Sequence, residues 1–162
     1  MLGRHQPPVQ EDIMKKITGL FVALLALFAV SSAFAGKEVL IPQDQLPQKA
    51  QDYLAQNFSG KEVSHVRLYT DFTDRDYKVY FADGDNIEFT IEGEVEEIEC
   101  PNSEVPEACI PEQALSAVRE IFPNAKILEI EFAGKKGNTE IKLSTGLKLE
   151  FNADYTWVDI DD

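Results

Sequence analysis

The sequence predicts an α+β fold in which a helix followed by a four-stranded antiparallel sheet occurs twice in tandem. Residues 83–99 (DGDNIEFTIEGEVEEIE) resemble residues 145–161 (TGLKLEFNADYTWVDID) at an offset of 62, which becomes 64 further upstream. Within each copy, one segment carries apolar residues at helical spacing. The segments after it alternate apolar and polar residues, as half-buried strands do.

Each copy is expected to begin with a helix just after an Ile-Pro pair, at Ile41-Pro42 and at Ile110-Pro111. Proline is tolerated in the first turn of a helix because the N–H that it lacks has no partner there. One apolar stripe marks each helix, and each stripe predicts that the helix lies with one face on the sheet. The stripe residues are Leu46, Ala50, Tyr53, Leu54 and Phe58 in the first copy, and Ala114, Leu115, Val118, Ile121 and Phe122 in the second.

Four short strands are predicted after each helix. They lie near 63–70, 77–82, 86–91 and 94–99 in the first copy, and near 126–133, 139–143, 148–151 and 156–160 in the second. Their connections are short and rich in Gly or Asp, so neighbouring strands are antiparallel. The helices are therefore expected on one face of the sheet, with the other face open to solvent.

Strict alternation assigns the strand residues to the two faces. The apolar positions, including Val158 and Ile160, are expected to face the helices. The open face is expected to carry His65, Arg67, Tyr69, Lys78, Tyr80, Glu88 and Thr90, followed by Glu129, Glu131, Lys142, Lys148, Glu150, Asn152, Trp157 and Asp159.

The N-terminal region has the order of features of a secretory signal peptide. Met14 precedes two lysines, an apolar run over 17–30 and an Ala-Phe-Ala site that ends at Ala35. We expect residues 1–13 to be a non-native start extension and residues 14–35 a signal peptide cleaved after Ala35, which leaves a periplasmic chain without a stable membrane anchor. The alternative is an uncleaved anchor, although the apolar core is shorter than the roughly 20 residues of a spanning helix. The two copies then occupy 36–100 and 110–162, joined by a linker at 101–109.

The charge of the chain restricts its partners. The formal net charge is −14 at pH 7. Phosphate backbones and anionic membrane surfaces would be repelled, so neither nucleic acid nor an anionic membrane is expected as a partner. Basic protein surfaces and cations remain, and solubility alone is the simpler explanation of the charge.

Cys100 and Cys109 flank a turn-rich segment with two prolines. In an exported chain, two cysteines this close in sequence predict a structural disulfide that closes the linker. The C-x-x-C spacing of a redox dithiol is absent. A zinc site would need further ligands, and His65 is the only histidine after Ala35.

No catalytic motif is present, so the sequence predicts neither an enzyme nor a cofactor. An enzyme would depend on His65, which has no supporting motif around it. The acidic turns at 71–76 and 83–86 offer oxygen ligands for calcium, but neither matches the EF-hand loop. Asp, Gly and Asn are also common in turns for backbone reasons alone, and no metal site is assigned.

Several short motifs are similar to the PepSY-like family of exported bacterial proteins, also called β-lactamase-inhibitor-like. They are the leader, Leu46-Pro47 before a helix that ends at Phe58, the hairpin Asp83-Gly84-x-x-Ile87-Glu88-Phe89, and the ending Phe151-Asn152-x-Asp154-x-x-Trp157-x-x-Ile160-Asp161. The resemblance implies a tandem α+β repeat with one continuous, curved sheet. Its concave face would bind a protein, as that of β-lactamase inhibitor protein does. The first copy departs from the pattern, with Val95 in place of the terminal Trp.

The predicted function is that of a non-enzymatic periplasmic binding or inhibitory module, monomeric or weakly dimeric, which docks an unknown protein or peptide on its open sheet face. Aromatic residues anchor many interfaces because they bury a large area with few rotatable bonds. The expected anchors are Trp157, Tyr69 and Tyr80, with Arg67, Lys78 and Glu131 setting the register. The alternative is a periplasmic protein that binds calcium or another small ligand at its acidic turns.

Overall fold

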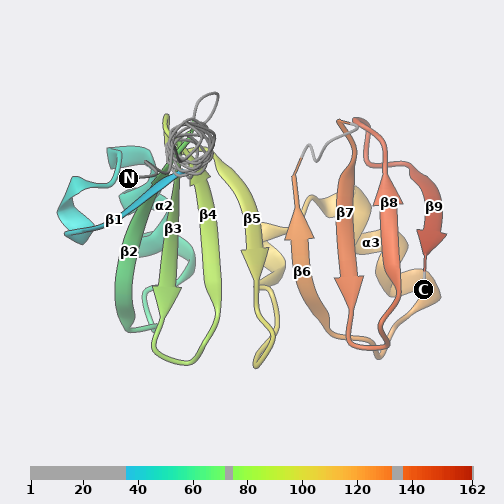
Figure 1. The fold of residues 1–162 in the computed structure, drawn as a ribbon. Coiled ribbons are helices and arrows are strands. Elements are labelled where there is room, and N and C mark those ends of the chain that lie inside the picture. The colour runs from blue at the N-terminus through green and yellow to red at the C-terminus, as the bar shows by residue number, and fades with distance from the viewer. Residues whose placement is uncertain (1–35, 72–74, 133–136, 162) are drawn as a thin grey trace, which may run out of the picture. The chain divides into compact units, whose positions relative to one another are not determined.

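Two helices and a single antiparallel sheet make up the computed structural model, which describes residues 36–71, 75–132 and 137–161 (Figure 1). The helices and the sheet belong to one compact unit, Lys37–Asp162. The predicted signal peptide and its cleavage site lie outside the described residues, as does part of the acidic turn at 71–76. None of the helices that the structure describes is long and apolar enough to cross a membrane.

The sheet has nine strands in sequential order, each antiparallel to the next. They are β1 (Lys37–Ile41), β2 (Val63–Thr70), β3 (Arg75–Phe81), β4 (Asn86–Thr90), β5 (Val95–Glu99), β6 (Ile127–Glu131), β7 (Thr139–Leu143), β8 (Lys148–Phe151) and β9 (Trp157–Asp161). The eight predicted strands are present, and their ends differ from the prediction by at most two residues.

The prediction of a four-stranded sheet in each copy needs two changes. First, β5 pairs directly with β6, with Ile98 opposite Ile130, so all the strands belong to one continuous sheet, as the family resemblance implied. This pairing satisfies backbone groups that two separate sheets would leave exposed at their edges. Second, β1 was not predicted. It pairs with β2, and Ile41 lies opposite Val66. Most β1 side chains are exposed, so backbone pairing rather than an apolar face holds this strand.

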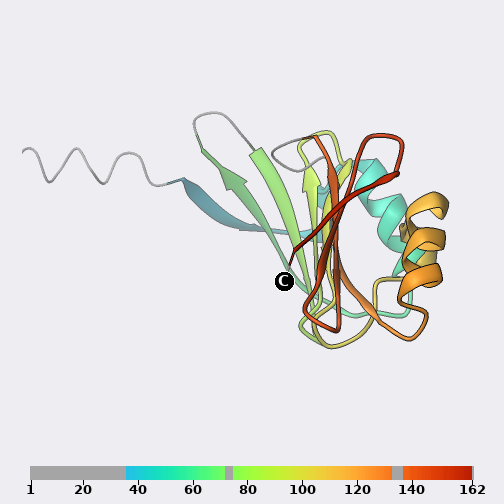
Figure 2. The same cartoon turned by 90° about the vertical axis from the view of Figure 1, so that its right-hand side faces the viewer.

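Both helices lie on one face of the sheet, as predicted (Figure 2). Helices α2 (Gln48–Asn57) and α3 (Glu112–Ile121) begin directly after Pro47 and Pro111. The first helix therefore starts later than the Ile41-Pro42 pair suggested, and a short 3₁₀ turn (Gln43–Gln45) fills the interval.

The core between helices and sheet is formed by small helix residues against large strand residues. Ala50 and Ala114 face the sheet and are fully buried, as are Phe89 and Phe151 on the strands. Small residues on the helices allow a close approach to the sheet, and the phenylalanines fill the layer between them. One stripe residue is an exception, since Ile121 at the end of α3 is 53% exposed.

The predicted disulfide is not formed in this structure: Cys100 and Cys109 are free and buried. Each thiol has a partner of its own. Cys100 lies beside Asp85 and Ser103, and burial followed by the charge of Asp85 raises the pKa of its thiol to about 12. Burial also raises the pKa of Cys109, which is hydrogen-bonded to Tyr53. Both thiols are therefore protonated at neutral pH, and they support the packing of the linker rather than closing it.

Candidate binding surface on the open sheet face

The strand registers place one carboxylate on each of six adjacent strands, in a line across the open face. Each member lies directly opposite the next. We call this line the acidic row; it consists of Glu88, Glu97, Glu131, Glu140, Glu150 and Asp159. With neighbouring strands about 4.8 Å apart, the row extends over roughly 24 Å.

Like charges placed directly opposite each other destabilise a sheet. Lysines offset part of this repulsion. Lys78 Nζ lies 2.5 Å from a carboxylate oxygen of Glu88 and 3.5 Å from one of Glu99. Lys148 Nζ lies 3.8 Å from Glu140. In the middle of the row, where Glu97 of β5 faces Glu131 of β6, no lysine or arginine of the described residues forms an ion pair with either carboxylate.

A dense group of carboxylates lies at the β5–β6 pairing. One ligand oxygen from each of Glu97, Glu99 and Glu129 lies within 4.8 Å of the others. Burial, then the charges of Glu99 and Glu88, raise the pKa of Glu97 to about 7. Glu129 also accepts a hydrogen bond from Lys142 at 3.0 Å. This group is therefore poised to take up a proton or another cation near neutral pH.

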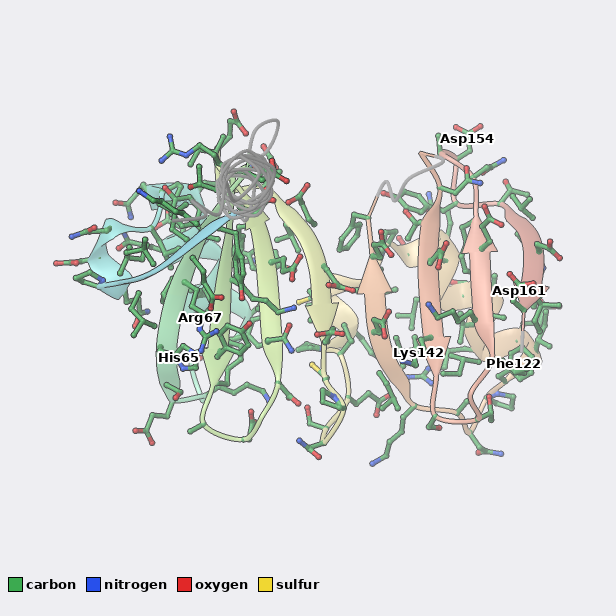
Figure 3. The ribbon with its side chains drawn as sticks, in the orientation of Figure 1. His65, Arg67, Phe122, Lys142, Asp154 and Asp161 are labelled. Carbon is green, nitrogen blue, oxygen red and sulfur yellow. The ribbon has the colours of Figure 1, made fainter. Side chains whose placement is uncertain are left out.

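A second group on the open face, which we call the aromatic–cation cluster, comes from β2 and β3. The hydroxyl groups of Tyr69 and Tyr80 are 3.2 Å apart. The His65 ring stacks on Tyr80 with 4.5 Å between centroids, and the Arg67 guanidinium lies 5.3 Å from the centre of the same ring. Lys78 lies 5.9 Å from that centre. Figure 3 labels His65 and Arg67 on this part of the sheet.

The cluster has both stacking and hydrogen-bonding capacity. Burial and the hydrogen bond with Tyr69 raise the pKa of Tyr80 to about 12, so both cationic neighbours face a neutral phenol. Arg67 also forms an ion pair with Glu38 of β1. Within the described part of the chain, His65 Nε2 and Arg67 Nε are shielded from solvent without a hydrogen-bond partner. A ligand that supplies an acceptor would satisfy the Arg67 Nε–H, and His65 Nε2 can donate or accept according to the tautomer of the ring.

Five of the six residues predicted to bind a partner lie on the open face. Arg67 and Lys78 are opposite each other and continue the line of the acidic row, in which Glu131 is a member. Tyr69 and Tyr80 form the centre of the aromatic–cation cluster. The structure therefore brings these five residues onto one surface. Four of them form its basic end, on β2 and β3, and Glu131 lies in its acidic middle.

Trp157 is the exception, since it lies on the helix side. Its ring stacks on Phe122 at the end of α3, with centroids 6.4 Å apart, and contacts the buried Phe151. The cause is a bulge. Phe151 pairs with Trp157 and Glu150 with Asp159, so Val158 is skipped and the alternation reverses there. Val158 is accordingly 52% exposed rather than directed into the core.

The acidic turn at 83–86 supports the fold in this structure. Lys61 forms ion pairs with Asp83, at 2.6 Å, and with the fully buried Asp85. Ser103 donates a hydrogen bond of 2.5 Å to Asp85. The Lys61 ammonium holds the pKa of Asp83 below its usual range. These contacts bind the turn to the linker, and they occupy carboxylates that a calcium ion would need.

The fold and this surface define a class of proteins with an open antiparallel sheet, two helices behind it and a charged exposed face. A family model described as "Putative beta-lactamase-inhibitor-like, PepSY-like" matches residues 33–71 and 75–161, and the chain belongs to this family. The resemblance seen in the sequence is thereby confirmed. No curated protein matches the chain significantly.

Solved structures share the same fold. The chain is similar to a "putative calcium-regulated periplasmic protein" from Bacteroides thetaiotaomicron, with 35% identity, a TM-score of 0.74, and coverage of 77% of this chain and 97% of the other. It is similar to a periplasmic protein from Bacteroides vulgatus, with 35% identity, a TM-score of 0.74, and coverage of 79% and 99%. A second periplasmic protein from Bacteroides vulgatus, described as of unknown function, is 27% identical with a TM-score of 0.72 and coverage of 78% and 100%. No enzyme family is indicated by these similarities.

Proposed function

We propose that this chain is a non-enzymatic periplasmic module that docks a basic protein or peptide on its open sheet face. The observation that carries the proposal is the acidic row, which places carboxylates from β4 to β9 directly opposite one another. Such an arrangement costs stability in the free protein. A partner that brings lysine or arginine side chains to the row would relieve the repulsion.

The mechanism of binding or inhibition would be steric, with charge setting the orientation. Complementary potentials steer association and fix register more than they add affinity. The aromatic–cation cluster lies at one end of the face and the acidic row runs away from it, so the two ends attract opposite charges. A partner segment with an acceptor or acidic group over Arg67 and basic residues over Glu131 and Glu140 would match this order.

Capture from periplasmic extract tests the proposal. Immobilised 36–162 would be compared with a Glu131→Gln/Glu140→Gln variant, which removes two carboxylates from the middle of the row. The matched control is Glu112→Gln/Glu120→Gln, which removes two exposed carboxylates from α3 on the opposite face. The proposal predicts a basic protein that the wild type and the control retain and the row variant loses. Equal capture by the two variants would place the interface elsewhere.

A second candidate function is calcium binding at Glu97, Glu99 and Glu129. Two observations favour it: the close approach of the three carboxylates, and the similarity to a protein described as calcium-regulated. Calcium takes six to eight oxygen ligands at roughly 2.3–2.6 Å. Three carboxylates and water molecules could supply them, provided that Lys142 moves away from Glu129. This site is not one of the acidic turns, at 71–76 and 83–86, from which the sequence suggested calcium ligands.

Calorimetric titration with CaCl₂ tests this candidate. A Glu97→Gln/Glu129→Gln variant should lose the calcium-dependent heat and the rise in Tm that accompanies binding to the folded state. The Glu131→Gln/Glu140→Gln variant removes the same charge from neighbouring positions and should keep both. If the two variants respond alike, calcium only screens the charged face, and a specific site is refuted.

A further inference from the structure

The outer edge of β9 is a second candidate interaction surface, distinct from the open face. Strand β9 is last in the sheet order, and no strand in the described part of the chain pairs with its outer side (Figure 1). Exposed edge strands present unused N–H and C=O groups, to which an extended peptide can pair.

Strand β5 is the counterpart of β9 in the first copy, and its outer edge is covered by β6. Strands β5 and β9 carry a bulge at equivalent positions. Glu96 is skipped between Val95 and Glu97 in the pairing with β4, and Val158 is skipped between Trp157 and Asp159 in the pairing with β8. On the outer side of β5, the N–H of Cys100 donates to Leu128 at 2.7 Å, and Glu96 accepts from the N–H of Phe132 at 2.7 Å. These bonds attach β6.

In β9, Val158 matches Glu96, and Ile160 matches Ile98, which lies opposite Ile130 of β6. Val158 and Ile160 lack such a neighbour among the described strands. They are 52% and 41% exposed. The N–H of Ile160 donates instead to the side chain of the preceding residue, at 2.9 Å from Asp159 Oδ1. This local bond is easily exchanged, because the carboxylate is itself exposed and can be solvated by water.

The two sides of this edge differ in chemistry. On the helix side, Ile160 lies opposite the buried Leu149, and the half-buried Trp157 stacks on Phe122. On the open side, Asp159 ends the acidic row and Asp161 lies opposite Lys148. Figure 3 labels Phe122 and Asp161 in this region. An added strand would meet an apolar surface on one side and carboxylates on the other, so the fitting sequence alternates apolar and basic residues.

We propose that the outer edge of β9 accepts an extended segment of a partner protein in which apolar and basic residues alternate. Charge complementarity with Asp159 and Asp161 selects this occupant. A second molecule of this protein fits less well, because the chain has a net charge of −14 and pairing of two β9 strands would bring their aspartates together.

The test uses a fluorescein-labelled synthetic peptide of alternating Lys and Val, about nine residues long to match a long strand. Binding to 36–162 is followed by fluorescence anisotropy, with a Glu–Val peptide for comparison. Two further peptides carry N-methyl groups, on every Lys or on every Val, which removes the N–H donors on one side of the strand. Edge pairing predicts that the Lys–Val peptide binds and the Glu–Val peptide does not. It also predicts that only one of the two N-methylated peptides retains binding.

Variants locate the site. Ile160→Pro removes the outward N–H and should weaken binding by at least about tenfold, as expected for a lost edge hydrogen bond with its neighbouring contacts. Asp159→Lys/Asp161→Lys should shift the preference to the Glu–Val peptide, which keeps the proposal testable if the proline variant does not fold. The Glu112→Gln/Glu120→Gln variant, which changes exposed carboxylates of α3 only, should bind the Lys–Val peptide as the wild type does.

Three outcomes would overturn the inference. Equal binding of both N-methylated peptides would exclude strand addition. If only the Glu131→Gln/Glu140→Gln variant fails to bind the Lys–Val peptide, the peptide lies across the acidic row. That result would support the proposed function but not the edge site. Self-association of the free chain that Ile160→Pro abolishes would show that the occupant is a second copy.

Discussion

Replacing Glu97 with glutamine tests whether the open face stores electrostatic repulsion. Burial, with Glu99 and Glu88 nearby, raises the pKa of Glu97 from an ordinary value of 4.5 to about 7. The folded state therefore binds this proton more tightly than the unfolded state. The resulting stabilisation is fully present below pH 4.5 and is lost as the pH rises through about 7. At about 1.4 kcal/mol for each pKa unit, the loss has an upper limit of about 3.4 kcal/mol.

Solvent screening of a half-buried carboxylate reduces that limit to about 1–2 kcal/mol. Glutamine has a similar shape but does not ionise. The free energy of unfolding of Glu97→Gln should therefore match that of the wild type near pH 4 and exceed it by about 1–2 kcal/mol near pH 9. Urea unfolding at the two pH values measures the difference, with the exposed Glu112→Gln as control. A difference that does not change with pH would refute the reasoning.

Three further substitutions and one control substitution test the packing by urea unfolding. Gly93→Ala should lower the free energy of unfolding by about 1–3 kcal/mol. Gly93 has φ +83°, and a Cβ there would lie 2.9 Å from the Cβ of Pro47. The control is Gly60→Ala, which has no atom within 4 Å of its new Cβ and should change the free energy of unfolding by less than about 0.5 kcal/mol. Trp157→Ala should cost about 2–3 kcal/mol yet leave partner capture unchanged in the folded protein, and loss of capture at full folding would show that the ring is part of the interface. Asp85→Asn should cost about 2–3 kcal/mol, because it leaves the Lys61 ammonium without its buried partner; a neutral result would mean that water replaces the ion pair.

The strands and helices were predictable because each has a strong period. Strand β2 occupies the predicted residues, and Thr139–Leu143 and Lys148–Phe151 agree with the predicted β7 and β8. Strand β1 was missed because its side chains are mostly exposed and carry no clear alternation. Its stability depends on pairing with β2, which is distant in sequence, and a local pattern does not contain that information.

The candidate surface was predicted only in part, for two physical reasons. A bulge reverses alternation, so a strict two-residue period placed Trp157 on the wrong face. The acidic row depends on register: Glu97, Glu131 and Glu140 are neighbours only once β5, β6 and β7 are paired. The individual carboxylates were visible among the many acidic residues, but their alignment was not. Once the β5–β6 pairing is known, the two-residue spacing of Glu97 and Glu99 on β5 places both carboxylates on the same face, opposite Glu131 and Glu129.

The central claim is that a basic partner docks on the open sheet face. The most direct measurement is NMR shift mapping of isotope-labelled 36–162 during titration with the captured partner. The claim predicts that the perturbed amides lie on β4 to β9 beside the acidic row, and that rising salt weakens the perturbation. Perturbations confined to α2 and α3, on the opposite face, would contradict it.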